Sequence, residues 1–245
     1  MKAMVLAAGL GTRLRPLTND RPKALVEVAG RTLLELTLNR LRSFGIFEVI
    51  INTHHFADMI ADYLETHHNF GMHIEISRER VLLDTGGGLK HAQHFFLGSD
   101  EPFLLHNVDV LSTIDFERLV QFHKQHGALA TIAVQDRATS RYLLFDENDR
   151  LCGRRAGLKG EPELVCPNGS FQAWAFCGIH VLSPKIFGEM QEEGVFSIIP
   201  TYLRLAAQGE PILRFAADRY YWRDMGKPPQ IAEAAREIDA GIYQY

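Results

Sequence analysis

A glycine-containing loop near the N-terminus carries the residue types that bind a polyphosphate. Gly9 and Gly11 follow a short apolar segment and allow the backbone to approach a ligand closely. Consecutive backbone N–H groups in such a loop form a concavity that binds anions. Arg13, Arg15 and Lys23 add fixed positive charge. The combination indicates a nucleoside triphosphate site, and the lack of a Gly-Lys-Ser/Thr ending excludes a Walker A loop.

Asp109 is a candidate metal ligand because it follows an apolar segment, 102–106, that is predicted to be a buried strand. Open α/β sheets bind their ligands beyond the carboxyl ends of such strands. Mg²⁺ keeps several waters and needs only one or two carboxylates beside substrate phosphates. A helix N-cap or a turn is the plainer explanation for a lone aspartate. The eleven histidines do not form a zinc pattern, since His91 and His94 have helical spacing but no evident further ligand.

Strand and helix patterns alternate through the first half of the chain. Strands are predicted at 2–7, 48–52, 73–77, 102–106 and 128–134, and helices at 32–44, around 56–64, at 85–96 and at 116–126. Short connections between them indicate a parallel sheet with helices on both faces. Further strands are predicted at 142–145, 151–155 and 171–182, and helices at 197–208 and 228–241. We therefore predict an α/β protein with one mixed, mostly parallel sheet and a single domain over 1–245.

Composition and charge narrow the class of protein. The 245 residues are 46% hydrophobic and 23% charged, which is ordinary for a globular chain. Lys and Arg number 26 against 30 Asp and Glu, so no basic excess favours nucleic acid as a partner. The apolar segments are too short to span a bilayer, and no membrane partner is expected. Three cysteines without metal-type spacing favour a reduced, cytoplasmic protein.

Several motifs together support a family assignment. Residues 6–18 read Leu-Ala-Ala-Gly-Leu-Gly-Thr-Arg-Leu-Arg-Pro-Leu-Thr, and Arg-Pro-Lys-Ala-Leu follows at 21–25. Further segments are Asp-Thr-Gly-Gly-Gly at 84–88, Asn-Val-Asp at 107–109, Phe-Cys-Gly-Ile-His-Val at 176–181 and Trp-Arg-Asp-Met-Gly-Lys-Pro at 222–228. This series closely resembles the sugar-1-phosphate nucleotidyltransferases. The resemblance implies a Rossmann-like nucleotidyltransferase fold, in which a sugar 1-phosphate and a nucleoside triphosphate give a nucleotide sugar and pyrophosphate.

The resemblance also implies roles for individual residues. Asp109 and Asp224 would hold Mg²⁺, and Arg13, Lys23 and Asp109 would be catalytic. Lys23, Arg141 and Gly178 would bind the sugar phosphate. Nucleotide binding is expected from Leu6, Ala7, Ala8, Gly9, Gly11, Thr12, Arg13, Glu79, Thr85, Gly87 and Asn107. The nucleotide part would cover about 1–135, the sugar part about 136–226, and a C-terminal helix 227–241.

Departures from the family pattern bear on the identity of the sugar substrate more than on the type of reaction. Val108 replaces the usual glycine, Arg141 stands near the usual Tyr-Gly pair, and the Glu-Lys-Pro sugar-phosphate motif is missing. Four cationic residues could bind the sugar phosphate in place of that motif, and the sequence does not choose among them: Arg141, Arg154, Arg155 and Lys159.

The short length and the run Thr-Gly-Gly-Gly at 85–88 look most like the N-acetylmuramate-1-phosphate uridylyltransferases of peptidoglycan recycling. We expect UTP to be preferred. The Glu79 carboxylate could accept from uracil N3–H, but equally from guanine, so the base stays open. Alternatives are mannose- or heptose-1-phosphate guanylyltransferases, a more distant cytidylyltransferase for an alcohol phosphate, and a non-catalytic nucleotide-sugar-binding regulatory subunit. A monomer and a homodimer are both compatible with the sequence.

Overall fold

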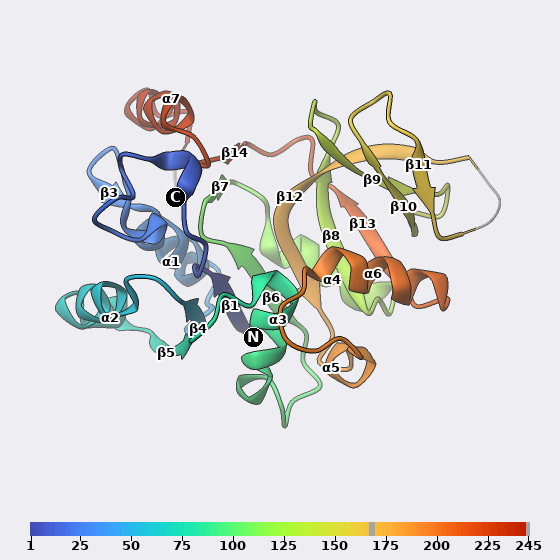
Figure 1. Ribbon diagram of the computed structural model, residues 1–245, viewed down its shortest axis with the longest axis horizontal. Helices are drawn as coiled ribbons and strands as arrows, with labels where there is room; N and C mark the ends of the chain where they lie inside the picture. Colours follow the sequence, from blue (N-terminus) through green and yellow to red (C-terminus); the bar gives the residue numbers. More distant parts are fainter. Residues whose placement is uncertain (167–169, 244–245) are drawn as a thin grey trace.

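A ten-stranded mixed sheet forms the centre of the protein in the computed structural model, which describes residues 1–166 and 170–243 (Figure 1). The first part of the sheet is parallel, in the order β6–β1–β4–β5. Its strands are β1 (Lys2–Leu6), β4 (Glu48–Thr53), β5 (His73–Arg78) and β6 (Phe103–Asn107). Their carboxyl ends lie at one edge of the sheet, which is where open α/β sheets bind ligands.

The second part of the sheet is mainly antiparallel and is organised by one long strand, β12 (Gln172–Leu182). Its carboxyl-terminal half pairs with β6 and its N-terminal half with β9. The pairing of β12 with β8 changes register between Phe176 and His180, around Gly178. The other strands of this part are β8 (Ala130–Gln135), β9 (Arg141–Phe145), β10 (Leu151–Ala156), β11 (Pro162–Leu164) and β13 (Ile212–Ala216).

Helices cover both faces of the sheet because successive strand side chains point to opposite faces. On one face, α1 (Leu33–Ser43), α2 (Ala57–Thr66) and α4 (Phe116–Gln125) share a core with Val5, Ile51 and similar residues. On the other face, α3 (Asp84–His91), α5 (Ile186–Glu189) and α6 (Ile198–Ala207) pack against Met4 and Ile50. The final helix, α7 (Pro228–Asp239), packs in a separate apolar cluster that contains Leu14 and Met225.

Two short strand pairs complete the fold near the edge where β1 ends. The pair β2 (Glu27–Val28) and β3 (Arg31–Thr32) is a small hairpin next to α7. The pair β7 (Val110–Ser112) and β14 (Trp222–Asp224) is antiparallel and joins the middle of the chain to its last part. Turns of 3-10 helix occur at Thr12–Leu14, Lys23–Leu25, His68–Gly71 and Gln93–Phe95.

The structure confirms the predicted α/β class with a mixed sheet and helices on both faces. The helix expected over 85–96 ends at His91 and continues as a 3-10 turn. Strand β13 was not predicted, and it enters the sheet parallel to β8. The glycine-containing loop expected near the N-terminus contains the 3-10 turn at Thr12–Leu14. Within residues 1–166 and 170–243, no helix has the length and apolar character needed to cross a bilayer.

Three buried histidines make stability depend on pH. Burial lowers the pKa of His106 and of His123 to about 4, and that of His180 to about 3, from an ordinary 6.5. The folded chain therefore keeps them neutral where the unfolded chain binds protons. Their contribution to stability is complete above about pH 6.5 and is lost as the pH falls toward 4.

We expect the free energy of unfolding, measured with urea, to be smaller at about pH 5 than at about pH 7. His123→Gln should reduce this loss by about 1–2 kcal/mol, because one protonation difference disappears. His126→Gln is the control, because His126 is exposed and lies three residues further on, at the end of α4. An equal pH dependence in the His123→Gln variant and the unmodified protein would contradict the prediction.

Candidate functional site

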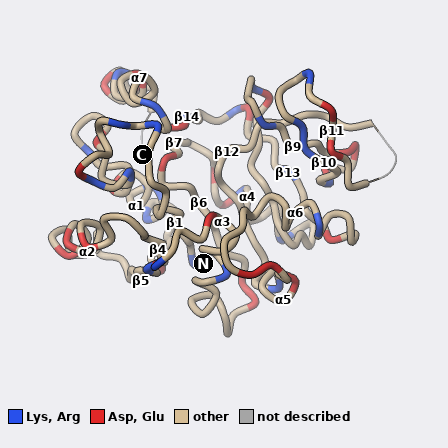
Figure 2. The backbone as a smooth tube through the Cα atoms, in the orientation of Figure 1, with Lys and Arg blue, Asp and Glu red and all other residues tan. Residues whose placement is uncertain are grey.

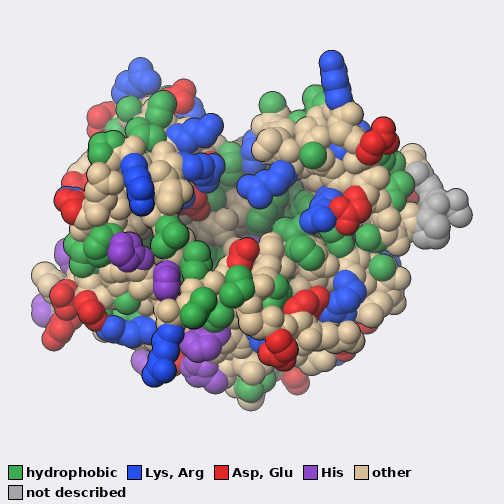
Figure 3. Space-filling model, in the orientation of Figure 1, with side chains coloured by type: hydrophobic (Ala, Val, Ile, Leu, Met, Phe, Trp, Pro, Cys, Tyr) green, Lys and Arg blue, Asp and Glu red, His purple; other side chains and the backbone are tan. Residues whose placement is uncertain are grey.

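A cavity of about 420 Å³ opens at the carboxyl ends of β1, β4 and β6. The space-filling view shows a hollow between the two sides of the molecule, with Lys and Arg side chains on both rims (Figure 3). Its lining includes the predicted residues Leu6, Ala7, Ala8, Gly9, Lys23, Thr85, Asn107 and Asp109. It also includes five residues that were not predicted, Asn52, Leu82, Asp84, Val108 and Val195. The structure thus brings together segments that are distant in the sequence.

The glycine loop owes its shape to Gly11, which has a φ of +62°. A Cβ atom at this position would lie 2.9 Å from Thr18 Cγ2 and 3.2 Å from Lys23 Cβ. The Thr18 hydroxyl donates to the Gly11 carbonyl at 2.9 Å, which closes the loop. Gly9, by contrast, has open space around its Cβ position and faces the cavity. One glycine is therefore needed for the loop conformation, and the other leaves room for a ligand.

Asn52, at the end of β4, supports the loop from behind. Its side-chain oxygen accepts from the Ala7 N–H at 2.7 Å, and its amide nitrogen donates to Glu79 Oε1 at 2.8 Å. Glu79 Oε2 accepts from the Leu83 N–H at 2.9 Å. Glu79 is only 5% exposed and does not line the cavity. Both of its carboxylate oxygens are occupied within the protein, so Glu79 acts in this structure as a support for Asn52.

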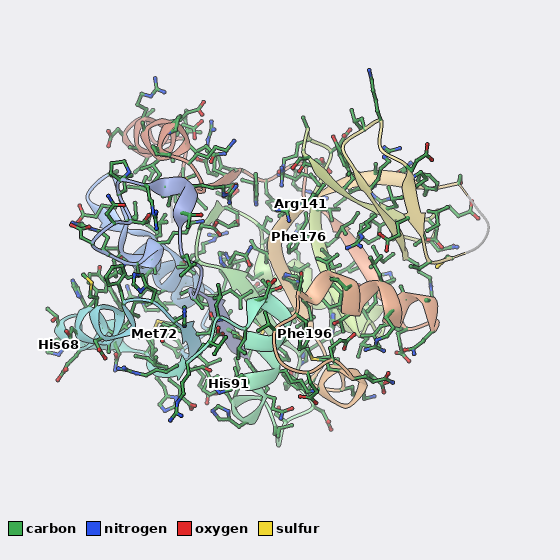
Figure 4. The ribbon with its side chains drawn as sticks, in the orientation of Figure 1. His68, Met72, His91, Arg141, Phe176 and Phe196 are labelled. Atoms are coloured by element: carbon green, nitrogen blue, oxygen red, sulfur yellow. The ribbon has the colours of Figure 1, made fainter. Side chains whose placement is uncertain are left out.

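Each glycine of the run at 86–88 is packed closely against another part of the protein. Cβ atoms at Gly86 and Gly87 would overlap the Phe196 ring and the Gly194 carbonyl. The Phe196 carbonyl accepts from the Gly86 and Gly87 N–H groups at 3.0 and 3.1 Å. Figure 4 labels Phe196 beside α3. The first N–H groups of α3 are therefore bonded to protein, and Gly87 lies under the segment 194–196 rather than in the cavity lining.

Four charged residues meet beside the cavity. The Lys23 ammonium forms an ion pair with Asp109, and Lys23 is 9% exposed. Burial and then the Asp109 charge raise the pKa of Asp224, while Lys23 and Arg13 act in the opposite direction. A Cβ atom on Gly226 would lie 2.8 Å from Asp224 Oδ1 and 2.9 Å from Arg13 Nη2, so these two groups are neighbours. Figure 2 shows the acidic segments at β7 and β14 next to basic segments of the N-terminal part.

The backbone holds the two carboxylates in place. The Met225 N–H donates to the Asp109 carbonyl at 2.7 Å, and Asp224 pairs with Val110 in the β7–β14 ladder. In the part of the chain that the structure describes, no cluster of three or more His, Cys, Asp or Glu side chains is arranged to hold a metal. A cation at this place would therefore have two carboxylate ligands and would take the rest from water or from phosphate oxygens, as Mg²⁺ does.

The predicted sugar-phosphate residues are divided: Lys23 lines the cavity, Gly178 lies next to Asn107, and Arg141 lies on the other side of the hollow. Gly178 has a φ of +73°, and its Cβ position is 2.9 Å from the Asn107 amide nitrogen. Figure 4 labels Arg141 at the start of β9 and Phe176 on β12, both on this side. Arg154, on β10, is paired with Glu163 at 2.6 Å. Thr12 lies in the 3-10 turn that begins after Gly11, outside the cavity lining.

Comparisons with a family model and with known proteins agree on one family. Residues 2–241 match the family model described as nucleotidyl transferase. The chain is 34% identical over 248 residues to N-acetylmuramate alpha-1-phosphate uridylyltransferase of Caulobacter vibrioides, with 97% of each chain covered. It is 30% identical to mannose-1-phosphate guanyltransferase beta-B of Xenopus laevis, where 93% of this chain spans 62% of the relative.

Solved structures agree on the fold. HddC from Yersinia pseudotuberculosis, in complex with GMP-PN, has a TM-score of 0.75 at 21% identity and covers 97% of this chain and 99% of its own. A putative glucose-1-phosphate thymidylyltransferase from Bacillus anthracis has a TM-score of 0.78 at 18% identity and covers 100% of this chain and 97% of its own.

The packing of Gly88 predicts a large effect of one methyl group. In Gly88→Ala the new Cβ would lie 2.6 Å from Glu79 Oε1 and 2.8 Å from Asn52 Nδ2, so these two buried side chains must shift and their hydrogen bond is disturbed. We expect a loss of about 1–3 kcal/mol in the free energy of unfolding by chemical denaturation. Gly188→Ala, where the Cβ position is open, is the matched control and should cost nothing. Equal stability of the two variants would show that the contact is unimportant.

Proposed function

The chain belongs to the nucleotidyl transferase family and is a sugar-1-phosphate nucleotidyltransferase; on that premise we propose that it transfers a uridylyl group from UTP to N-acetylmuramate 1-phosphate. A sugar-phosphate oxygen forms a bond to the α-phosphorus of UTP, and the bond from that phosphorus to the bridging oxygen breaks. Pyrophosphate leaves with the electron pair, and the products are a nucleotide sugar and pyrophosphate. The observation that carries the reaction class is the cluster of Lys23, Arg13, Asp109 and Asp224 beside the cavity, whose wall includes Gly9, Lys23 and Asp109.

This reaction depends on alignment and on the neutralisation of charge. The attacking group is already an anion at neutral pH, so a general base is not needed. Lys23, a compact charge beside the cavity, would bridge the α-phosphate and the incoming sugar phosphate. Arg13 would hold the β- and γ-phosphates, because a planar guanidinium can donate to two oxygens at once. Both would stabilise the charge that develops on pyrophosphate.

The residues at the β7–β14 pair fit a Mg²⁺ ion. Asp109 and Asp224 are two neighbouring carboxylates, and burial followed by the Asp109 charge raises the pKa of Asp224. Bound there with the triphosphate, Mg²⁺ would supply charge neutralisation between the two phosphates. Lys23 would leave Asp109 for the phosphates when the metal and nucleotide are bound. The ion pair seen in the structure therefore keeps both side chains in position before the substrates arrive.

The choice of substrate rests on weaker support than the reaction. The Caulobacter relative, whose printed name includes N-acetylmuramate 1-phosphate and uridylyl transfer, matches this chain along almost the full length of both proteins. On the strength of this similarity we place the proposed reaction in peptidoglycan recycling in the cytoplasm. The Ala8 and Gly9 backbone would read the base from one side, with Leu82 and Thr85 on the cavity wall opposite.

Mannose- or heptose-1-phosphate guanylyltransferase is the second candidate. The Xenopus relative and the Yersinia structure with its guanine nucleotide favour it. A non-catalytic subunit is disfavoured, because such a protein would be free to lose the four charged residues, and all four are present and in electrostatic contact.

Asp109→Asn tests the metal assignment. The change keeps the shape of the side chain but removes a charge, so we expect Mg²⁺-dependent pyrophosphate release to fall by about 10²-fold or more. The thermal midpoint should change little. Asp62→Asn, an exposed aspartate on α2, is the charge-matched control and should remain fully active. Near-normal turnover by folded Asp109→Asn would remove Asp109 from the proposed metal site.

The nucleotide is tested by steady-state pyrophosphate release with UTP, GTP, CTP, ATP and dTTP at equal concentration. Each should be combined with N-acetylmuramate, N-acetylglucosamine, mannose and glucose 1-phosphates. We expect a sharp preference for UTP, because a site that pairs buried polar groups rejects a base that leaves them unpaired. Tenfold faster release with GTP than with UTP would replace the uridylyl proposal by the guanylyl one and leave the reaction class standing.

A further inference from the structure

The missing Glu-Lys-Pro motif leaves the sugar phosphate without its expected cation, and Arg137 is placed to replace it. Arg137 follows β8 and is half-buried. Its Nη2 donates to the Phe176 carbonyl at 2.6 Å, and its guanidinium carbon lies 3.7 Å from the centre of the Trp222 ring. The Trp222 indole N–H in turn donates to the Cys177 carbonyl at 2.7 Å. The guanidinium is therefore held from two sides, next to the bend at Gly178.

Arg137 lies beside the metal-binding end of β14. Trp222 and Asp224 are two residues apart on this strand, so their side chains leave the same face. Burial lowers the pKa of the Arg137 guanidinium, while the nearby Cys177 side chain and the Asp224 carboxylate oppose this effect. An arginine keeps its charge in spite of such burial. A fixed cation thus stands near the Asp224 carboxylate, against Trp222 and the Phe176 carbonyl.

The hydrogen bonds of this guanidinium are incomplete. Its Nε is buried and has no partner, and Arg137 forms no ion pair with any other residue in 1–166 or 170–243. A half-buried cation without a carboxylate partner is costly unless an anion joins it. The surrounding chain nevertheless fixes this position, because Gln135 donates to the Ala217 and Tyr220 carbonyls and the Asp136 N–H donates to Asp218.

The four cationic residues that the sequence offered for the sugar phosphate lie in less suitable positions than Arg137. Arg154 is paired with Glu163, and Arg154 and Arg155 lie on β10, which is separated from β12 by β9. Lys159 follows β10 and is exposed, and Arg141 is exposed at the start of β9. Arg137 instead contacts β12 and β14 directly.

We propose that Arg137 is the residue that binds the 1-phosphate of the sugar substrate. This inference rests on the proposed nucleotidyl transfer. The sugar phosphate must approach the α-phosphate of the nucleotide against the repulsion between two negative charges. A cation is therefore needed beside the sugar phosphate, near the carboxylate pair Asp109 and Asp224. The guanidinium of Arg137 supplies that charge through its Nη groups, since its Nε is buried, and stacking on Trp222 fixes the orientation of the guanidinium plane.

The test is calorimetric binding of sugar 1-phosphates to the full chain with Mg²⁺ and a non-hydrolysable UTP analogue. Arg137→Gln should weaken N-acetylmuramate 1-phosphate and N-acetylglucosamine 1-phosphate by about 10–100-fold each. Affinity for the UTP analogue should change less than about threefold. Arg137→Lys should restore part of the loss. Arg219→Gln, an exposed arginine near the Tyr220 ring, is the matched control and should change nothing.

Three results would overturn the proposal. A loss confined to N-acetylmuramate 1-phosphate would show that Arg137 binds the carboxylate of that sugar instead of the phosphate. A loss of UTP-analogue affinity together with a lower thermal midpoint would show that Arg137 only supports the fold. Unchanged sugar-phosphate affinity would remove it from the site. Because binding is measured without turnover, a lack of pyrophosphate release by the unmodified enzyme counts against the proposed function alone.

Discussion

The repulsion between Asp109 and Asp224 is the constraint on which the rest of the site depends. The β7–β14 ladder and the Met225–Asp109 hydrogen bond bring two carboxylates together in a partly buried place. Burial and the neighbouring charge raise the pKa of Asp224, so cations must stay close if both groups are to remain ionised. Lys23 supplies one of them as an ion pair, and Pro22 and the 3-10 turn at 23–25 fix its position. The glycine loop, with the close approach of Gly11 to Lys23, makes that position possible.

The wall of the cavity that α3 forms is held by the segment 189–198, which belongs to the second half of the chain. Lys90 donates to the Met190 and Glu192 carbonyls and to Glu193. The Phe196 carbonyl accepts from α3, and the Ile198 N–H donates to Thr85 Oγ1 at 3.0 Å. The three glycines at 86–88 let this segment lie directly on α3. Val195 consequently reaches the cavity wall although it is 61% exposed.

Local sequence patterns predicted most of the helices and strands and much of the cavity lining. Residues such as Asn107 and Asp109 follow apolar strands, and the ends of parallel strands meet, so their closeness could be expected. Asn52 has the same position at the end of β4, and that signal was available but was not used. The contacts of Glu79 and of Val195 could not be predicted, because they depend on packing between distant segments. The same holds for β13, whose pairing with β8 is set by the completed sheet.

The β7–β14 pair also affects how the protein is made. A ribosome releases the glycine loop and Asp109 long before Asp224, and the docking of Ile198 on Thr85 joins residues 113 positions apart. Contacts between such distant residues slow folding and form late. Until Asp224 emerges, Asp109 can pair with Lys23, and this ion pair leaves no carboxylate without a cation. The second carboxylate of the cluster is thus added only when nearly all of the sheet can already form around Asp109.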